Sequence, residues 1–183
     1  MDRKQLGPGS AALTAFALGA LAVLLTLGIG LAVQDSLSSL ANTLVAAPVI
    51  EELVKAVPLI LMIRMIRTAK RGAMLGVSAG AGFGMIENLG YFVASMDTDL
   101  LLLRSFTTLP LHAAATGVLG YGIGSRRAGT AAVCLLMAIA LHMAFNTLAM
   151  SAVLWGEWTA IPSLVLRIAV PAATLVLLAH RSR

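Results

Sequence analysis

The sequence predicts an all-α membrane protein: a polytopic helix bundle with about six transmembrane helices and both termini in the cytoplasm. Hydrophobic residues make up 59% of its 183 residues and charged residues only 11%, with a mean hydropathy of +0.93. Soluble domains are about 45–50% apolar and about 25% charged. A spanning helix takes about 20 apolar residues, so little chain is left outside the bilayer. We therefore expect a single integral membrane domain over residues 1–183, with any chemistry supplied by side chains inside the membrane.

Six apolar segments fill most of the chain, and each is long enough to cross about 30 Å of hydrocarbon. The first follows Arg3 and Lys4 and exceeds the apolar region of about 7–15 residues that a cleaved signal peptide contains. We expect it to be kept as a spanning helix. In chain order the predicted spans are Ala11–Val33, Ser38–Ile66, Gly72–Ser95, Leu100–Gly124, Ala128–Trp155 and Ala160–Ala179.

Prolines and glycines shape the second and third segments. Pro48 and Pro58 each remove a backbone donor and tend to kink a helix, which would widen a cavity beside them. In the third segment, glycines recur every four residues and form a smooth stripe against which another backbone can pack closely. These glycines are Gly72, Gly76, Gly80 and Gly84.

Charged residues in the loops indicate the orientation. Most of the 13 Lys and Arg residues fall on one side of the predicted membrane, and four acidic residues with only Arg104 fall on the other. The positive-inside rule then places both termini in the cytoplasm, and we expect a multi-pass protein of the cytoplasmic membrane. The net charge of +5 is spread over these loops without interleaved aromatic residues, which argues against nucleic acid as a partner. The bilayer itself is the expected surrounding.

Polar residues inside the predicted spans are few, and they come to similar depths. A charge at mid-bilayer costs about 2.5–3.5 kcal/mol on insertion scales, so such residues usually face the bundle interior and serve function. At a rise of about 1.5 Å per residue, four different helices bring a carboxylate or an imidazole within about one turn of their middles. The intramembrane polar residues are Glu51, Glu52, Lys55, Glu87, Asn88, His112, Thr116, His142, Asn146 and Arg167.

The adjacent glutamates of the second span are expected to differ in role. Glu51 and Lys55 are spaced i,i+4 and share a helix face, whereas Glu52 points about 100° away. We expect one glutamate to act on water and the other to bind a cation or pack. Lys55 is expected to neutralise Glu51, and Arg167 to snorkel outward or pair with a carboxylate.

These polar residues are compatible with two arrangements of an active site for hydrolysis. In one, Glu51 or Glu52 acts with His112 as a general base on water, while His142 and Asn146 donate hydrogen bonds to an oxyanion.

In the other arrangement the same groups hold a divalent metal such as zinc. Two imidazoles and a carboxylate, here His112, His142 and Glu87, suit Zn²⁺ with one open position. The H-E-x-x-H pattern of zinc proteases is absent from the sequence.

Four motifs in order resemble those of the PrsW family of intramembrane proteases, over about residues 44–150. They are "APVIEELVKA", "GAGFGMIENLGYF", "LPLHAAATGVLGYGIG" and "LHMAFN", each on its own predicted helix. The family is distantly similar to CAAX-processing and immunity-type membrane endopeptidases, whose second motif carries His where this chain has Glu87.

The resemblance implies an endopeptidase that cleaves a membrane-anchored protein substrate and depends on glutamate or metal. Its best-known members cleave an anti-sigma factor, but the short loops of this chain do not support that particular substrate. Two other classes stay open: a proton-coupled transporter, and a non-enzymatic immunity or scaffold protein. The residues that the resemblance makes catalytic are Glu51, Glu52, Glu87, His112, His142 and Asn146.

Overall fold

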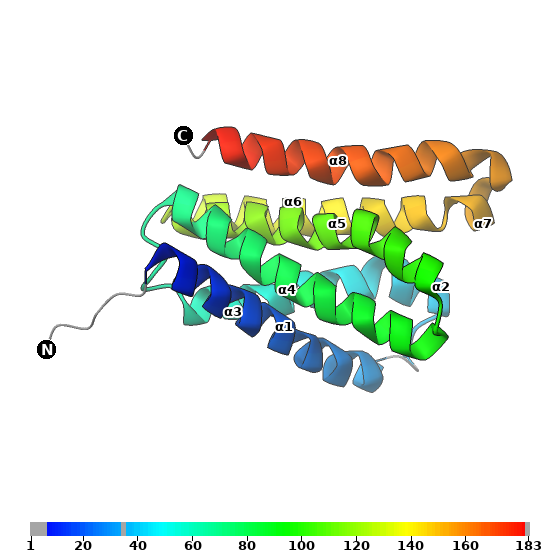
Figure 1. The fold of residues 1–183 in the computed structure, drawn as a ribbon, viewed down its shortest axis with the longest axis horizontal. Coiled ribbons are helices and arrows are strands. Elements are labelled where there is room, and N and C mark those ends of the chain that lie inside the picture. Colours follow the sequence, from blue (N-terminus) through cyan, green and yellow to red (C-terminus); the bar gives the residue numbers. More distant parts are fainter. Residues whose placement is uncertain (1–6, 34–35, 182–183) are drawn as a thin grey trace, which may run out of the picture.

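The computed structural model describes residues 7–33 and 36–181, and the regular elements in these ranges are all helical. Successive long elements run in alternating directions along the bundle, and the start of α1 and the end of α8 lie at the same end (Figure 1). The elements are α1 (Pro8–Val33), α2 (Ser39–Ala41), the π-helix η2 (Asn42–Ala46), α3 (Ala47–Leu61), α4 (Ala69–Ser95), α5 (Thr98–Gly124), α6 (Ala128–Ala149), α7 (Ser151–Trp155), the 3₁₀-helix η3 (Glu157–Thr159) and α8 (Ala160–Arg181).

The predicted all-α membrane fold is confirmed, with a difference in how apolar the helices are. In the described part of the chain, three helical stretches are long and apolar enough to cross a membrane: Pro8–Val33, Ala128–Ala149 and Glu157–His180. Helices α4 and α5 have 27 residues each, so their length also suffices. Their glycines and polar residues make them less apolar, as expected of helices that pack against several neighbours.

The second predicted span, Ser38–Ile66, is interrupted. It is divided into α2, η2 and α3, and α3 ends at Leu61, where a turn begins. Pro48 at the start of α3 explains the first break, because its nitrogen has no hydrogen to donate to the preceding turn. The π-helix before it widens the backbone at that point. At Pro48, the irregularity expected from the proline takes the form of a change from π-helix to α-helix.

The glycine stripe of α4 packs directly on α5, as predicted. A Cβ placed on Gly76 would collide with the backbone oxygen of Thr116, and one on Gly80 with that of His112. The opposite face of α4 approaches α1 equally closely, because a Cβ on Gly82 would meet the backbone oxygen of Phe16. This close approach sets His112 of α5 against the middle of α4.

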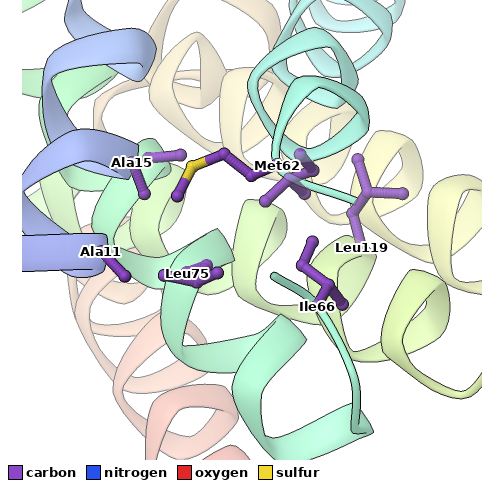
Figure 2. Packing of buried hydrophobic residues seen from close by; sticks show 8 residues of the cluster. Ala11, Ala15, Met62, Ile66, Leu75 and Leu119 are labelled. Carbon is purple, nitrogen blue, oxygen red and sulfur yellow. The ribbon is translucent and has the colours of Figure 1, made fainter. Parts of the chain in front are cut away.

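A hydrophobic cluster joins α1, α3, α4 and α5 (Figure 2). Met62, just after α3, extends toward Ala15 of α1 across the cluster. The cluster fixes the position of α3 relative to its neighbours, which in turn positions the glutamates about two turns before Leu59. Its buried members are Ala11, Ala15, Leu59, Met62, Ile66, Leu75, Ala79 and Leu119.

Candidate metal and active site

The ionisable side chains of α3 are buried and converge on one another. Lys55 Nζ donates to Glu52 Oε1 at 2.8 Å and to Glu51 Oε2 at 3.4 Å. It also lies 4.3 Å from the centroid of the Phe83 ring. The expectation that the two glutamates differ in direction is too simple, because their side chains are long enough to reach the same ammonium across the 100° between them. Lys55 neutralises both, and its nearer partner is Glu52.

Each of the two histidines presents one ring nitrogen to a carboxylate. His112 Nε2 lies 2.8 Å from Glu87 Oε2, and His142 Nδ1 lies 2.8 Å from Glu52 Oε1. Lys55 Nζ, which can only donate, lies 2.7 Å from His112 Nδ1. These contacts assign the ring hydrogens to His112 Nε2 and His142 Nδ1. The lone pairs of the other two ring nitrogens therefore face the interior of the cluster.

Glu51 lies between those two lone pairs. Its Oε2 is 4.0 Å from His112 Nδ1 and 3.9 Å from His142 Nε2, and the rings of the histidines meet edge to face with centroids 5.2 Å apart. Within the described residues, Glu51, His112 and His142 form a buried group with donor atoms all within 4.8 Å of one another, suited to a metal ion. The carboxylate of this group is Glu51, whereas the sequence predicted that Glu87 would be the carboxylate ligand beside the two histidines.

The donor set fits a divalent ion. The ligands of a tetrahedral zinc ion, bound at about 2.0–2.2 Å, are about 3.3 Å apart, so these donor atoms, now within 4.8 Å of one another, would have to move closer together by up to about 1.5 Å. Metal-binding imidazoles usually donate their second N–H to a carboxylate, and Glu87 and Glu52 accept those bonds here. Lys55 contacts the same lone pair of His112 that would bind the ion. Its ammonium must therefore move aside when an ion binds.

Arg104 extends the cluster beyond Glu87. Its Nη2 donates to Glu87 Oε2 at 2.9 Å and its Nε to Asn88 Oδ1 at 3.0 Å, and it stacks 3.8 Å from the Tyr91 ring centroid. From the sequence alone, Arg104 was expected among the loop charges. Its spacing of eight from His112 on α5, two helical turns on the same face, is the signal that could have found it.

A cavity of about 440 Å³ opens beside the cluster, within the range of about 300–1,000 Å³ that ligand pockets occupy. Glu51, Glu87 and His142 lie on its wall, whereas the fully buried Glu52 does not. A substrate or water in the cavity would thus meet Glu51 and Glu87, but not Glu52.

Asn146 also lines the cavity, and its side chain completes the backbone hydrogen bonding at the π-helix. Its Nδ2 donates to Thr43 O at 2.9 Å. The π-helical hydrogen bond spans five residues, as the one from Ala47 N–H to Asn42 O does. The corresponding donor for Thr43 O would be Pro48, which has no N–H. Asn146 supplies the missing hydrogen bond, and the second Nδ2 hydrogen is left for another acceptor.

Arg167 lies on the cavity wall. In the part of the chain that the structure describes, it has no ion pair, and its Nε is buried without a hydrogen-bond partner. A buried unsatisfied donor costs about 1–3 kcal/mol. Of the two expectations for Arg167, pairing with a carboxylate is not observed among the described residues, and snorkelling outward stays a prediction; the guanidinium lies 5.6 Å from the centroid of the Phe145 ring.

A buried set of carboxylates and imidazoles, opening onto a cavity within a membrane helix bundle, defines an intramembrane hydrolase. The family comparison agrees: the model of the PrsW family of intramembrane metalloproteases matches residues 7–177, and the chain belongs to that family. It is thus a peptide-bond hydrolase of the membrane, not a transporter or a scaffold. No curated protein and no solved structure matches the chain.

Proposed function

We propose that the chain cleaves a membrane-anchored protein in the cavity, with a divalent ion, best zinc, held by Glu51, His112 and His142. One observation carries this assignment. Glu51 Oε2 lies 4.0 Å from His112 Nδ1 and 3.9 Å from His142 Nε2, the two ring nitrogens that carry no hydrogen. The chemistry that such an ion supplies when bound is to acidify water and polarise the scissile carbonyl.

Glu87 is the proposed general base. It lies on the cavity wall with 20% of its side chain exposed, and it is not one of the three candidate ligands. A carboxylate in this position can take a proton from water and return it to the leaving amine. Arg104 holds Glu87 in place through a 2.9 Å ion pair.

Glu52 and Lys55 are proposed to position the other groups. Glu52 accepts a hydrogen bond from His142 and fixes its tautomer, and Lys55 neutralises the glutamates when no ion is bound. Asn146 contributes its second Nδ2 hydrogen to the oxyanion, since His142 as a ligand has no hydrogen left to donate.

The proposed topology has six spans with both termini in the cytoplasm. The alternating direction of the long elements and the basic loops support it (Figure 1). The break at η2 does not oppose a span, because irregular helix is tolerated at membrane depth where it lines a cavity. On this topology the protein belongs to the cytoplasmic membrane.

Cleavage of a membrane-anchored reporter by the purified protein in liposomes tests the assignment. We expect Glu51→Gln, Glu87→Gln and His142→Ala each to lower turnover by at least about 10²-fold. The exposed Glu157→Gln is the matched control and should cleave like the wild type. Glu51→Gln and His142→Ala variants that both retain wild-type turnover would contradict the proposed site.

A further inference from the structure

Arg167 is the charged residue that the proposed mechanism does not use. It lies within the apolar helix α8, yet it shares the cavity wall with Glu51, Glu87 and Asn146. Inside a membrane, arginines usually face a partner or a water-filled cavity and mark a functional site. Its position therefore indicates that Arg167 binds a ligand in the cavity.

The part of the chain that the structure describes supplies no partner of opposite charge to Arg167. Among the described residues Arg167 has no ion pair, its Nε is buried without a hydrogen bond, and its one aromatic contact is with Phe145. Arg104 on the same cavity wall is the contrast, because it is engaged by Glu87, Asn88 and Tyr91. The guanidinium of Arg167 is thus a positive charge on the cavity wall that no described residue neutralises.

The chemistry of the guanidinium group indicates which class of ligand it would bind. Its planar set of N–H donors matches the two oxygens of a carboxylate, and only an anionic group also balances the charge. The glutamates on the wall would repel a substrate carboxylate from the catalytic groups. Arg167 is the one place on the wall, among described residues, where a cation is not already paired with a glutamate.

We propose that Arg167 forms a subsite for an acidic side chain, Asp or Glu, of the substrate polypeptide near the cleaved bond. The subsite rests on the proposed function, because it presumes that the substrate enters this cavity. It goes further in naming a property of the substrate: an acidic residue at a fixed distance from the cleaved bond. Arg167 would act on binding rather than on the chemical step.

The test uses the full protein in phosphatidylcholine liposomes with reporters that carry one Asp, moved position by position along the cleaved region. Each Asp reporter is paired with its Asn isostere. We expect the wild type to prefer Asp at one position by about tenfold in kcat/KM, mostly through KM. Arg167→Met should lose the preference, and Arg167→Lys should keep part of it. Arg127→Met, which removes an exposed charge away from the cavity, should leave it unchanged.

A charge reversal provides a gain of function. Arg167→Glu should cleave the reporter with Lys at the selected position better than the one with Asp. A wild type without preference at any position, or an Arg167→Met variant that keeps the wild-type preference, overturns the proposal. An Arg167-dependent response to phosphatidylglycerol that replaces the Asp preference assigns the subsite to a lipid phosphate and also overturns it.

A binding measurement separates this proposal from the proposed function. Affinity for the Asp and Asn reporters is measured in the Glu51→Gln background, with and without Arg167→Met. An affinity difference that needs Arg167 supports the subsite even if the wild type cleaves no reporter, a result that would count against the proposed function alone. Equal affinities in both proteins overturn the subsite. Thermal melting of Arg167→Met should show no loss of stability, because the substitution removes an unsatisfied buried donor.

Discussion

Lys55 has three close polar contacts within the buried site. Its ammonium touches His112 Nδ1 at 2.7 Å, Glu52 Oε1 at 2.8 Å and Glu51 Oε2 at 3.4 Å. The Lys55 ammonium lies beside buried carboxylates and balances their charge, because buried carboxylates are costly to leave unpaired. A bound divalent ion would supply the same charge. Lys55 and the ion therefore compete for the same neighbours.

This competition predicts that Lys55→Met binds zinc more tightly than the wild type. Without zinc the variant should be destabilised by about 3–5 kcal/mol, because removing one partner leaves buried charge uncompensated. Zinc should restore more stability to it than to the wild type. Competition with a chelator gives the affinities, and melting curves with and without zinc give the stabilities. Lys70→Met, at an exposed site, is the control. Weaker zinc binding by Lys55→Met would contradict the competition.

Glu87 should matter for metal affinity as well as for catalysis. It accepts a hydrogen bond from His112 Nε2, and loss of such an outer partner typically lowers metal affinity by about 10–100-fold. Glu87→Gln should show this loss in a zinc titration, whereas Glu157→Gln should not. Unchanged affinity would mean that Glu87 does not orient His112.

At the level of helices, the contact between α4 and α5 controls where the site residues meet. The close approach at Gly76 and Gly80 brings the backbone of α5 against α4, so that His112 and Glu87 lie within hydrogen-bond distance. A wider separation of the two helices would break this pair. The glycine stripe is thus a structural requirement of the site, although no glycine takes part in the chemistry.

Gly76→Ala should lower the free energy of unfolding by about 1–3 kcal/mol, as overpacking of a tight contact does. Its new Cβ would meet the backbone oxygen of Thr116, which cannot move without shifting α5. Gly90→Ala is the matched control on the same helix, because a Cβ there meets nothing within 4 Å. Denaturant titration in detergent measures both variants. Equal stabilities would contradict the tight packing.

For the whole molecule, the proposed six spans predict which loops are accessible from each side. In a Cys134→Ser background, Arg127→Cys should react with an impermeant maleimide only from the cytoplasmic side, and Asp99→Cys only from the outer side. Both positions are exposed in the structure. Labelling of both from one side would contradict the topology, since α5 lies between them.

The sequence predicted the helical membrane fold and the meeting of Glu51, Glu52, Glu87, His112 and His142, because charges inside apolar segments stand out. The glycine stripe of α4 could equally be predicted, from the four-residue spacing of its glycines. The division of the second span was not, since it depends on a π-turn and on Asn146 reaching Thr43 O from another helix. Which carboxylate joins the histidines depends on side-chain directions that spacing alone does not specify.

Arg104 and Arg167 show the same limit at single positions. Both were interpreted from their place along the chain, one as a loop charge and the other as a surface or paired cation. Their actual neighbours lie on other helices: Glu87 of α4 for Arg104, and Phe145 of α6 for Arg167. Tertiary contacts between helices decide such roles.

The most direct test of the central claim is the zinc content of the purified protein after loading and removal of excess metal, measured by elemental analysis. The proposed site predicts one zinc per chain for the wild type and for Glu157→Gln. It predicts almost none for Glu51→Gln, His112→Ala and His142→Ala, because each removes one of the three ligands. Wild-type zinc content in all three of these variants would contradict a metal centre formed by Glu51, His112 and His142.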